Sequence, residues 1–469
     1  MSNNGKALKS GIWYTLSSFL VKAIGFLTTP FFTRLLTKEE FGLFSNYTSW
    51  LSIFGIFITL NLESTLISAR YDYEKEFDKY ILSMLALSSM SVCVWAVVLN
   101  IFSNTTFKFT GVSQYYINIM LVYLLFQPAV NLFQARERFL FKYKKSVLAS
   151  VIISVGTALL SVLLVFFMNN KLEGRVYGYV IPTIILGIVF YIYFVRKGFK
   201  IDIKYWKYAI PICFPYIPHL LSGILLNNMD RVMINKWCGS EATAMYSLAY
   251  SCGAIVTLLV NAINSAYAPW LGEKLSENKY KEIRYVSKIY IFCFCLFAIG
   301  IMLISPEILY VLGGKGYEES KYVITPVAMG CVCQFLYTMF GNVEQFKKKT
   351  VGMAGATVTA ALINFILNSL FIPQYGYLAA AYTTLIGYLT LLAIHMFIVW
   401  KLGYSQVYDY PYVVSMVLSG VVLSSIITIS FNYLVIRMVM IFVYITVVTF
   451  LVFKNKNKLL TMINSRKGR

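Results

Sequence analysis

The stretch GIWYTLSSFLVKAIGFLTTPFF, residues 11–32, is long and apolar enough to cross a bilayer as one helix. Lys22 lies near its middle, where a charged side chain costs about 2.5–3.5 kcal/mol on insertion scales, so we expect water or protein around it. Polar or small residues follow one another at steps of three or four and share one helix face: Thr15, Ser18, Lys22, Gly25, Thr29 and Thr33. This stripe predicts a helix that lines a wet cavity; tight packing of small residues against another helix is the alternative.

Composition indicates a membrane protein. The 469 residues are 58% hydrophobic and only 13% charged, whereas soluble domains carry about a quarter charged residues. The net charge of +21 sits in short clusters between apolar stretches, which does not indicate a nucleic-acid-binding domain. The first stretch is too long for a signal-peptide core and lacks a cleavage site, so we expect it to be retained. Most of the cysteines fall inside apolar stretches without metal-ligand or disulfide spacing, and we expect no metal site and no cofactor.

Hydropathy predicts an all-α polytopic membrane protein with fourteen transmembrane helices. The expected spans are 11–32, 41–62, 80–102, 115–133, 146–168, 176–195, 206–226, 242–266, 287–304, 323–340, 351–372, 378–399, 412–431 and 434–453. Lys and Arg favour alternate links between these spans by roughly three to one, which predicts that both termini lie in the cytoplasm.

Two echoes in the sequence indicate an internal duplication. The link 33–45 resembles the link 235–247 at an offset of 202, and the end of the fourth span resembles the end of the tenth at 207. Six helices per unit give the two halves the same orientation, so we expect two pseudo-symmetric lobes around a central cavity. The predicted parts are 1–200 for the first lobe, 201–403 for the second, and 404–469 for two added helices and a basic tail.

Polar stripes recur in other spans and supply candidate cavity residues. The second span carries Ser45, Thr48, Ser52, Gly55, Thr59 and Glu63, and the eighth carries Tyr246, Tyr250, Gly253, Thr257, Asn261 and Asn264. Gln127 and Asn131 share one face at the end of the fourth span. Three prolines on one face of the seventh span predict a bent helix that lines the cavity. The alternative is that these polar residues join helices to one another.

Several segments of the chain resemble the hallmarks of a known family. The run NFILNSLFIPQYGYLAAAYT, residues 364–383, is similar to a hallmark of the polysaccharide-transporter family of O-antigen and capsule repeat-unit flippases. So are Leu36-Thr37 with the segment 40–44, the segment 229–234 followed by 244–250, and Gly316-Tyr317. The resemblance implies a protein of the bacterial cytoplasmic (inner) membrane that belongs to the multidrug/oligosaccharidyl-lipid/polysaccharide exporter superfamily. It also implies two six-helix lobes around a V-shaped cavity.

The same resemblance implies a function. It is the translocation of undecaprenyl-pyrophosphate-linked oligosaccharide by alternating access, for surface polysaccharide biosynthesis, with H⁺ or Na⁺ as a coupling ion and a polysaccharide polymerase or ligase as a partner. A cation-coupled multidrug exporter of the same superfamily is one alternative, and it calls for a more apolar or acidic cavity. A membrane polymerase or ligase is the second, and it calls for a large outer loop with catalytic residues, which the sequence lacks; we expect no enzyme.

Candidate site residues follow from charge and position. Lys22 is expected to contact the pyrophosphate, with further positive charge from Arg70, Arg34, Lys236 and Arg231. Glu63 and Asp230, expected near the outer third of the second and seventh spans, are candidate coupling carboxylates. Each could instead pair with a cation: Asp230 with Arg231, and Glu63 with Lys22. The first lobe is expected to carry most of the cavity charge, because Ile224 stands where the duplication aligns Lys22.

Overall fold

The computed structural model describes residues 3–140 and 142–454, and within them helices are joined by short turns, with no β-strand. Thirteen helices of this described part are long and apolar enough to cross a membrane. The predicted all-α polytopic membrane fold is therefore confirmed.

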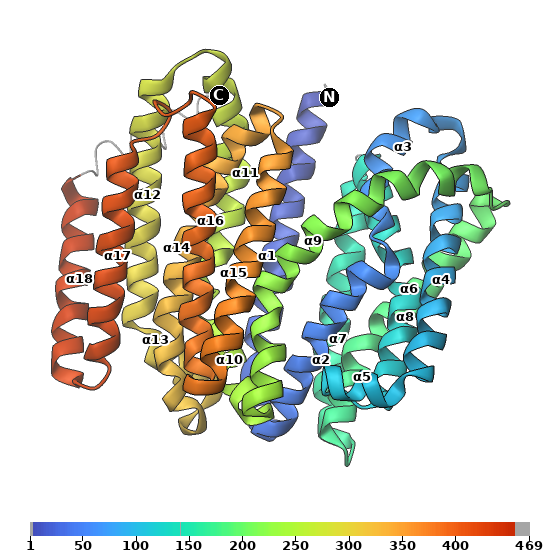
Figure 1. Cartoon of the computed structure of the whole chain (residues 1–469), viewed down its shortest axis with the longest axis horizontal. Helices are drawn as coiled ribbons and strands as arrows, with labels where there is room; N and C mark the ends of the chain where they lie inside the picture. The colour runs from blue at the N-terminus through green and yellow to red at the C-terminus, as the bar shows by residue number, and fades with distance from the viewer. Residues whose placement is uncertain (1–2, 141, 455–469) are drawn as a thin grey trace.

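The helices form two groups that stand side by side, with a last pair at one edge (Figure 1). The first group contains α1 (Asn3–Leu35), α2 (Lys38–Thr59), η1 (Leu62–Thr65), α3 (Leu66–Asp72), η2 (Glu74–Glu76), α4 (Phe77–Ile101), α5 (Ser103–Thr110), α6 (Gln114–Phe139), α7 (Tyr143–Phe167) and α8 (Lys171–Gly198). The second contains α9 (Ile203–Cys238), α10 (Ser240–Gly253), α11 (Val256–Ser276), α12 (Tyr280–Leu303), α13 (Ser305–Gly313), η3 (Lys315–Ser320), α14 (Lys321–Phe346), α15 (Thr350–Tyr375) and α16 (Tyr377–Lys401). The pair at the edge is α17 (Tyr410–Ser430) and α18 (Leu434–Lys454).

The predicted span 242–266 is the one that differs in form. It is divided between α10 and α11, which meet at Ala254 and Ile255. At the break, the carbonyl of Ala254 accepts from the backbone N–H of Thr257 at 2.9 Å and from its hydroxyl at 2.7 Å, so this backbone group is satisfied. With this broken helix counted as one span beside the thirteen, the structure is consistent with the predicted fourteen.

The order of the helices repeats between the two groups. The helices α6 and α14 are each 26 residues long and begin 207 positions apart. The helices α7 and α15 also begin 207 positions apart. The short helix α5 precedes α6, and the short helix α13 precedes α14. The two units therefore repeat the order of a short helix followed by two long helices over these segments.

The long helix α9 joins the two units. Tyr205, Ala209 and Cys213 pack into a core cluster with residues of α4 and α6, whereas Leu226 packs into the core of the second unit. Three prolines lie inside α9, at positions 211, 215 and 218, and the last two fall between these two contacts. The first ten or so residues assigned to the second lobe by the predicted boundary thus pack against the first (Figure 1).

The two units meet at the end of the molecule where α1 finishes, which we call the closed end. The side chain of Thr33 donates to the carbonyl of Leu312, and Arg34 Nη2 donates to the carbonyl of Val311 at 3.4 Å. The rings of Phe41 and Tyr317 pack edge to face with centroids 6.3 Å apart. These contacts join α1 and α2 to α13 and η3, at the opposite end from the start of α1 (Figure 1).

Gly42 permits the closest approach at the closed end. A Cβ atom at this position would overlap the backbone carbonyl of Ser240 at the start of α10. We expect Gly42→Ala to lower the thermal unfolding temperature of the purified protein, since overpacking costs about 1–3 kcal/mol. The matched control is Gly355→Ala in α15, where a Cβ meets no atom within 4 Å and alanine favours the helix. Equal melting of the two variants would refute tight packing at Gly42.

Candidate functional site

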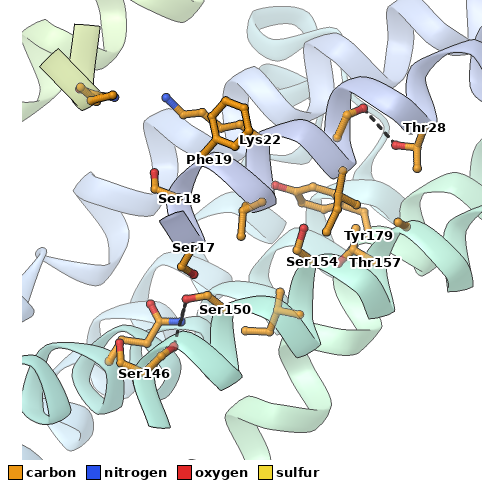
Figure 2. Close-up of a pocket in the computed structure, with 18 of the residues that line it drawn as sticks. Ser17, Ser18, Phe19, Lys22, Thr28, Ser146, Ser150, Ser154, Thr157 and Tyr179 are labelled. Atoms are coloured by element: carbon orange, nitrogen blue, oxygen red, sulfur yellow. Dashed lines mark hydrogen bonds between the residues drawn. The ribbon is translucent and has the colours of Figure 1, made fainter. Parts of the chain in front are cut away.

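A central cavity of about 780 Å³ lies between α1, α7 and α11 (Figure 2). On α1 it is lined by Ser17, Ser18, Phe19, Val21, Lys22, Ile24, Gly25 and Thr28; on α7 by Ser146, Ser150, Ile153, Ser154, Thr157 and Ala158. The remaining lining residues are Gln134 and Arg138 of α6, Arg175 and Tyr179 of α8, and Asn261, Ala262 and Ser265 of α11. The cavity is therefore built mainly by the first unit.

The stripe predicted on the first helix faces these hollows. Ser18, Lys22 and Gly25 line the central cavity, and Thr29 lines the outer pocket described below. The side chain of Thr15 lies outside the described residues. Lys22 makes no hydrogen bond or ion pair with any residue that the structure describes, and Figure 2 shows it on the other side of α1 from the α7 serines. The alternative pairing of Lys22 with Glu63 is wrong, because Glu63 lines a different pocket and bonds to Asn131.

A second hydroxyl stripe lies on α7, which the sequence analysis missed. Ser146, Ser150, Ser154 and Thr157 all face the cavity (Figure 2). Gln134 Nε2 donates to the hydroxyl of Ser150 at 3.2 Å. The spacing of three or four residues is the same signal that identified the stripe on α1, so the sequence did contain it.

An inner pocket of about 620 Å³ lies beside the central cavity and shares Gln134 and Arg138 with it. Here Asn131 Nδ2 donates to Glu63 Oε1 at 3.1 Å. Burial raises the pKa of Glu63, and the hydrogen bond from Asn131 offsets part of this rise. The expected position of Glu63 near the outer third of its span is wrong: α2 ends at Thr59, and the chain turns through η1 into α3 at the end of the molecule where α1 begins (Figure 1).

An outer pocket of about 280 Å³ lies on the other side of the central cavity, toward the closed end, and shares Arg175 with it. Arg231 also lines this pocket, donating to the carbonyl of Asn227 at 3.0 Å with its guanidinium 4.6 Å from the ring centroid of Tyr250. Hydroxyl groups cover much of the remaining wall: Thr29, Ser45, Thr48, Ser49, Ser247 and Ser251. The pocket therefore combines two guanidinium groups with a row of hydrogen-bonding side chains.

Asp230 lies away from these pockets, fully buried in the second unit. Its carboxylate accepts hydrogen bonds from Tyr246 at 2.5 Å, Asn368 at 2.7 Å and Thr384 at 2.6 Å. Asn368 in turn donates to Asn364 Oδ1 at 3.2 Å. The described residues show no hydrogen bond or short ion pair between Asp230 and Arg231, so the predicted alternative of a salt bridge between them is wrong.

Several predicted residues lie outside the pocket linings. Arg34 binds Val311 at the closed end, Arg70 donates to the carbonyl of Phe139, and Lys236 is exposed beside Trp237. Asn264 accepts from Asn342 at 2.7 Å, and Gln127 lies near Gly55. Arg34, Arg70 and Lys236 lie in the last turns of α1, α3 and α9, and these helix ends pack away from the cavity.

The charge of the central cavity comes from the first unit, as predicted. Lys22, Arg138 and Arg175 all line it, whereas α11 contributes only Asn261, Ala262 and Ser265. No carboxylate is among the described lining residues. Such a surface suits an anionic ligand that also carries many hydroxyl groups.

Two family models match the chain. The model described as polysaccharide biosynthesis protein matches residues 7–275, and the model described as MatE matches residues 215–370. The second match falls on α9 to α15, within the unit that repeats the first.

Curated relatives cover most of the chain at low identity. "Lsg locus putative protein 1" of Haemophilus influenzae is 22% identical over 427 residues, which is 85% of this chain and 99% of the relative. The "Putative O-antigen transporter" of Shigella flexneri is 22% identical over 80% of this chain and 93% of its own. The "Probable low-salt glycan biosynthesis flippase Agl15" of Haloferax volcanii is 26% identical over 43% of this chain and 44% of its own.

Solved structures share the fold. The inward closed conformation of the lipid II flippase MurJ matches with a TM-score of 0.70 at 14% identity, over 96% of this chain and all of that one. An inward-facing multidrug resistance MATE transporter of the MOP superfamily matches with a TM-score of 0.65 at 13% identity, over 82% of this chain and 95% of that one. Since the first family model covers more than half of the chain, the protein belongs to the polysaccharide biosynthesis protein family, in agreement with the resemblance seen in its sequence.

Proposed function

We propose that the protein is a flippase that moves undecaprenyl-pyrophosphate-linked oligosaccharide repeat units across the bacterial cytoplasmic membrane by alternating access. The observation that carries this proposal is the composition of the central cavity: three cations, two stripes of hydroxyl groups and no carboxylate among its described lining residues. A diphosphate requires the cations, and sugars require hydrogen-bonding partners.

The cavity also argues against the two alternatives. A cation-coupled multidrug exporter is expected to present acidic or apolar walls to its substrates, and this cavity is basic. A polymerase or ligase requires a catalytic loop outside the membrane. The connections at the closed end consist of short helices such as α5 and α13. Relatives named as a flippase and as an O-antigen transporter support the same choice.

A complementation experiment tests the proposed function. A strain that lacks the gene should lose the surface polysaccharide while its lipid-linked repeat units accumulate on the cytoplasmic side, and the wild-type gene should restore export. Measuring the lipid-linked intermediate beside the surface glycan separates a transport defect from a defect in sugar synthesis. Normal display in the deletion strain would refute the proposal.

Lys22 is the first residue to vary in that strain. Since the ammonium has no partner among the described residues, Lys22→Ala should leave the amount and melting temperature of the protein unchanged or slightly higher. Export should fall about 10- to 100-fold, because a charge-assisted hydrogen bond contributes about 1.5–3 kcal/mol. Lys22→Arg should retain much of the export. Full export by Lys22→Ala would exclude a contact with the pyrophosphate.

Glu63 is a candidate coupling carboxylate of the inner pocket. Gln at this position keeps an acceptor for Asn131 but cannot ionise, so Glu63→Gln should reduce export several-fold without reducing the inserted protein. Because the pKa of Glu63 is raised, its proton is taken up at a higher pH than that of a free carboxyl, and the variant should flatten the pH dependence of export. Glu74→Gln, at an exposed position, is the control. An unchanged pH profile would count against Glu63.

Asp230 is the better candidate for a Na⁺ ligand. It is a single buried carboxylate among amide and hydroxyl groups of Asn364, Asn368, Tyr246 and Thr384, and hard cations prefer oxygen ligands. A Na⁺ ion would be held by the carboxylate together with these oxygens. An ion in this place would link α9 to α10, α15 and α16, which are the helices that supply the hydrogen bonds to the carboxylate.

The Na⁺ assignment predicts a salt-specific effect on stability. The melting temperature of the purified protein should be higher in NaCl than in choline chloride of equal ionic strength, because an ion that binds only the folded state stabilises it. Asp230→Asn should remove this difference, and Glu318→Gln, which alters an exposed carboxylate, should not. A difference that persists in Asp230→Asn would place the ion elsewhere.

A further inference from the structure

Arg175 stands in the wall between the central cavity and the outer pocket, and it lines both. Two glycines on the same helix hold it there. A Cβ on Gly174 would lie 2.7 Å from the carbonyl oxygen of Leu164, and a Cβ on Gly178 would overlap the backbone of Ser161. The helix α8 therefore packs directly on the backbone of α7, and Arg175 is projected from a fixed position.

Two aromatic rings occupy the faces of the Arg175 guanidinium. Its central carbon lies 3.6 Å from the ring centroid of Phe32 and 4.4 Å from that of Phe44. Both rings are buried, with exposures of 2% and 8%. Stacking of this kind stabilises a desolvated cation through its faces but does not use its N–H groups, which point outward in the plane of the guanidinium.

The N–H groups of Arg175 have no acceptor among the residues that the structure describes, and no carboxylate of that part of the chain forms a salt bridge with it. A guanidinium has five donors, and their fork matches the oxygens of a phosphate group. The two adjoining hollows are the spaces into which these donors can reach. Arg175 is thus preorganised to bind an anion.

The outer pocket supplies the rest of such a site. Arg231 enters it from α9, so that two guanidinium groups, one from each unit, face one small space. Ser45, Thr48 and Ser247 add hydroxyl donors from α2 and α10. The volume of about 280 Å³ is little more than a third of the central cavity, which favours a compact anion over a sugar chain.

We propose that Arg175 and Arg231 form a second binding site for the pyrophosphate of the lipid-linked substrate, in series with Lys22 and Arg138. The inference rests on the proposed function and adds to it an order of events. The diphosphate first meets the cations of the central cavity and then transfers to the outer pair, with Arg175 as the group that belongs to both hollows. The outer pocket lies next to the contacts that close the molecule, so an anion there is in place when the closed end opens.

A binding experiment on the full-length protein in lipid nanodiscs tests this site. The probe is undecaprenyl pyrophosphate, and the measurement is the rise in melting temperature as a function of its concentration. Arg175→Gln should weaken apparent binding about 10- to 100-fold, because it removes a charge-assisted contact. Arg175→Lys, which keeps the charge but not the planar fork, should give a smaller loss. Lys108→Gln removes one exposed cation near the same end and should bind like the wild type.

Phe44→Leu separates anion binding from helix packing. If Arg175 serves the anion, Phe44→Leu should keep most of the binding, since the guanidinium and its donors remain. If Arg175 only packs between the rings, Phe44→Leu and Arg175→Gln should lower binding and melting temperature alike, and the proposal fails. It also fails if Arg175→Gln binds the probe as tightly as the wild type.

A second probe distinguishes the lipid headgroup from a free anion. Inorganic pyrophosphate should protect the protein only at much higher concentration than undecaprenyl pyrophosphate; protection by the inorganic anion alone would overturn the assignment to the substrate. The test is separable from the proposed function. If binding depends on Arg175 but the protein exports no glycan, the proposed function is refuted and the binding site is supported. If export is normal but binding does not depend on Arg175, the binding site is refuted and the proposed function is supported.

Discussion

The cost of placing a positive charge inside a membrane governs this structure. Lys22, Arg138 and Arg175 lie on helices that cross the bilayer, and each would be expensive to expose to lipid. All three instead face one cavity between the two units. The hydroxyl stripes of α1 and α7 keep that cavity polar, and Phe32 and Phe44 stabilise the cation that lies deepest toward the closed end.

The internal duplication accounts for the order of the helices but not for the charged side chains that face the cavity. The equivalent helices α6 and α14 each end in a buried glutamate, Glu137 or Glu344, at the offset of 207. In the first unit Glu137 pairs with Arg136, which also binds Asp78. In the second, Glu344 pairs with His395 at 2.5 Å. One residue further along α6, Arg138 faces the cavity, whereas the second unit has Gln345. Both units thus carry the helix-end carboxylate, and at the next position only the first unit carries a cation.

The predictability of the site from sequence depended on helix boundaries. The polar stripe of α1 was predicted because it lies wholly within one span, where a period of three to four fixes a face. Arg175 was missed because the span was expected to begin at 176. The side chain of Asn170 caps the helix by accepting from the backbone of Glu173, so α8 begins at Lys171 and Arg175 lies within it. Glu63 was predicted at the wrong end of its span. The helix α2 runs from the closed end toward the end where α1 begins, so a residue that follows α2 lies at that second end. Arg70 and Lys236 lie outside the cavity, contrary to expectation. Hydropathy predicts where a helix crosses the membrane, but it does not predict how the ends of the helix pack.

The bent helix α9 connects the cavity to the second unit. Its first part is fixed to the first unit by Tyr205 and Lys204, which bind Glu76, and its second part carries Arg231 into the outer pocket and Asp230 into the second unit. Since Arg231 and Asp230 are adjacent residues of one helix turn, a shift of that turn moves both groups together. A rearrangement around Asp230 that shifts this turn would therefore also move the guanidinium of Arg231 in the outer pocket. The three prolines lie between the two parts of α9 and remove backbone hydrogen bonds there, so the helix can bend without disturbing either packed end.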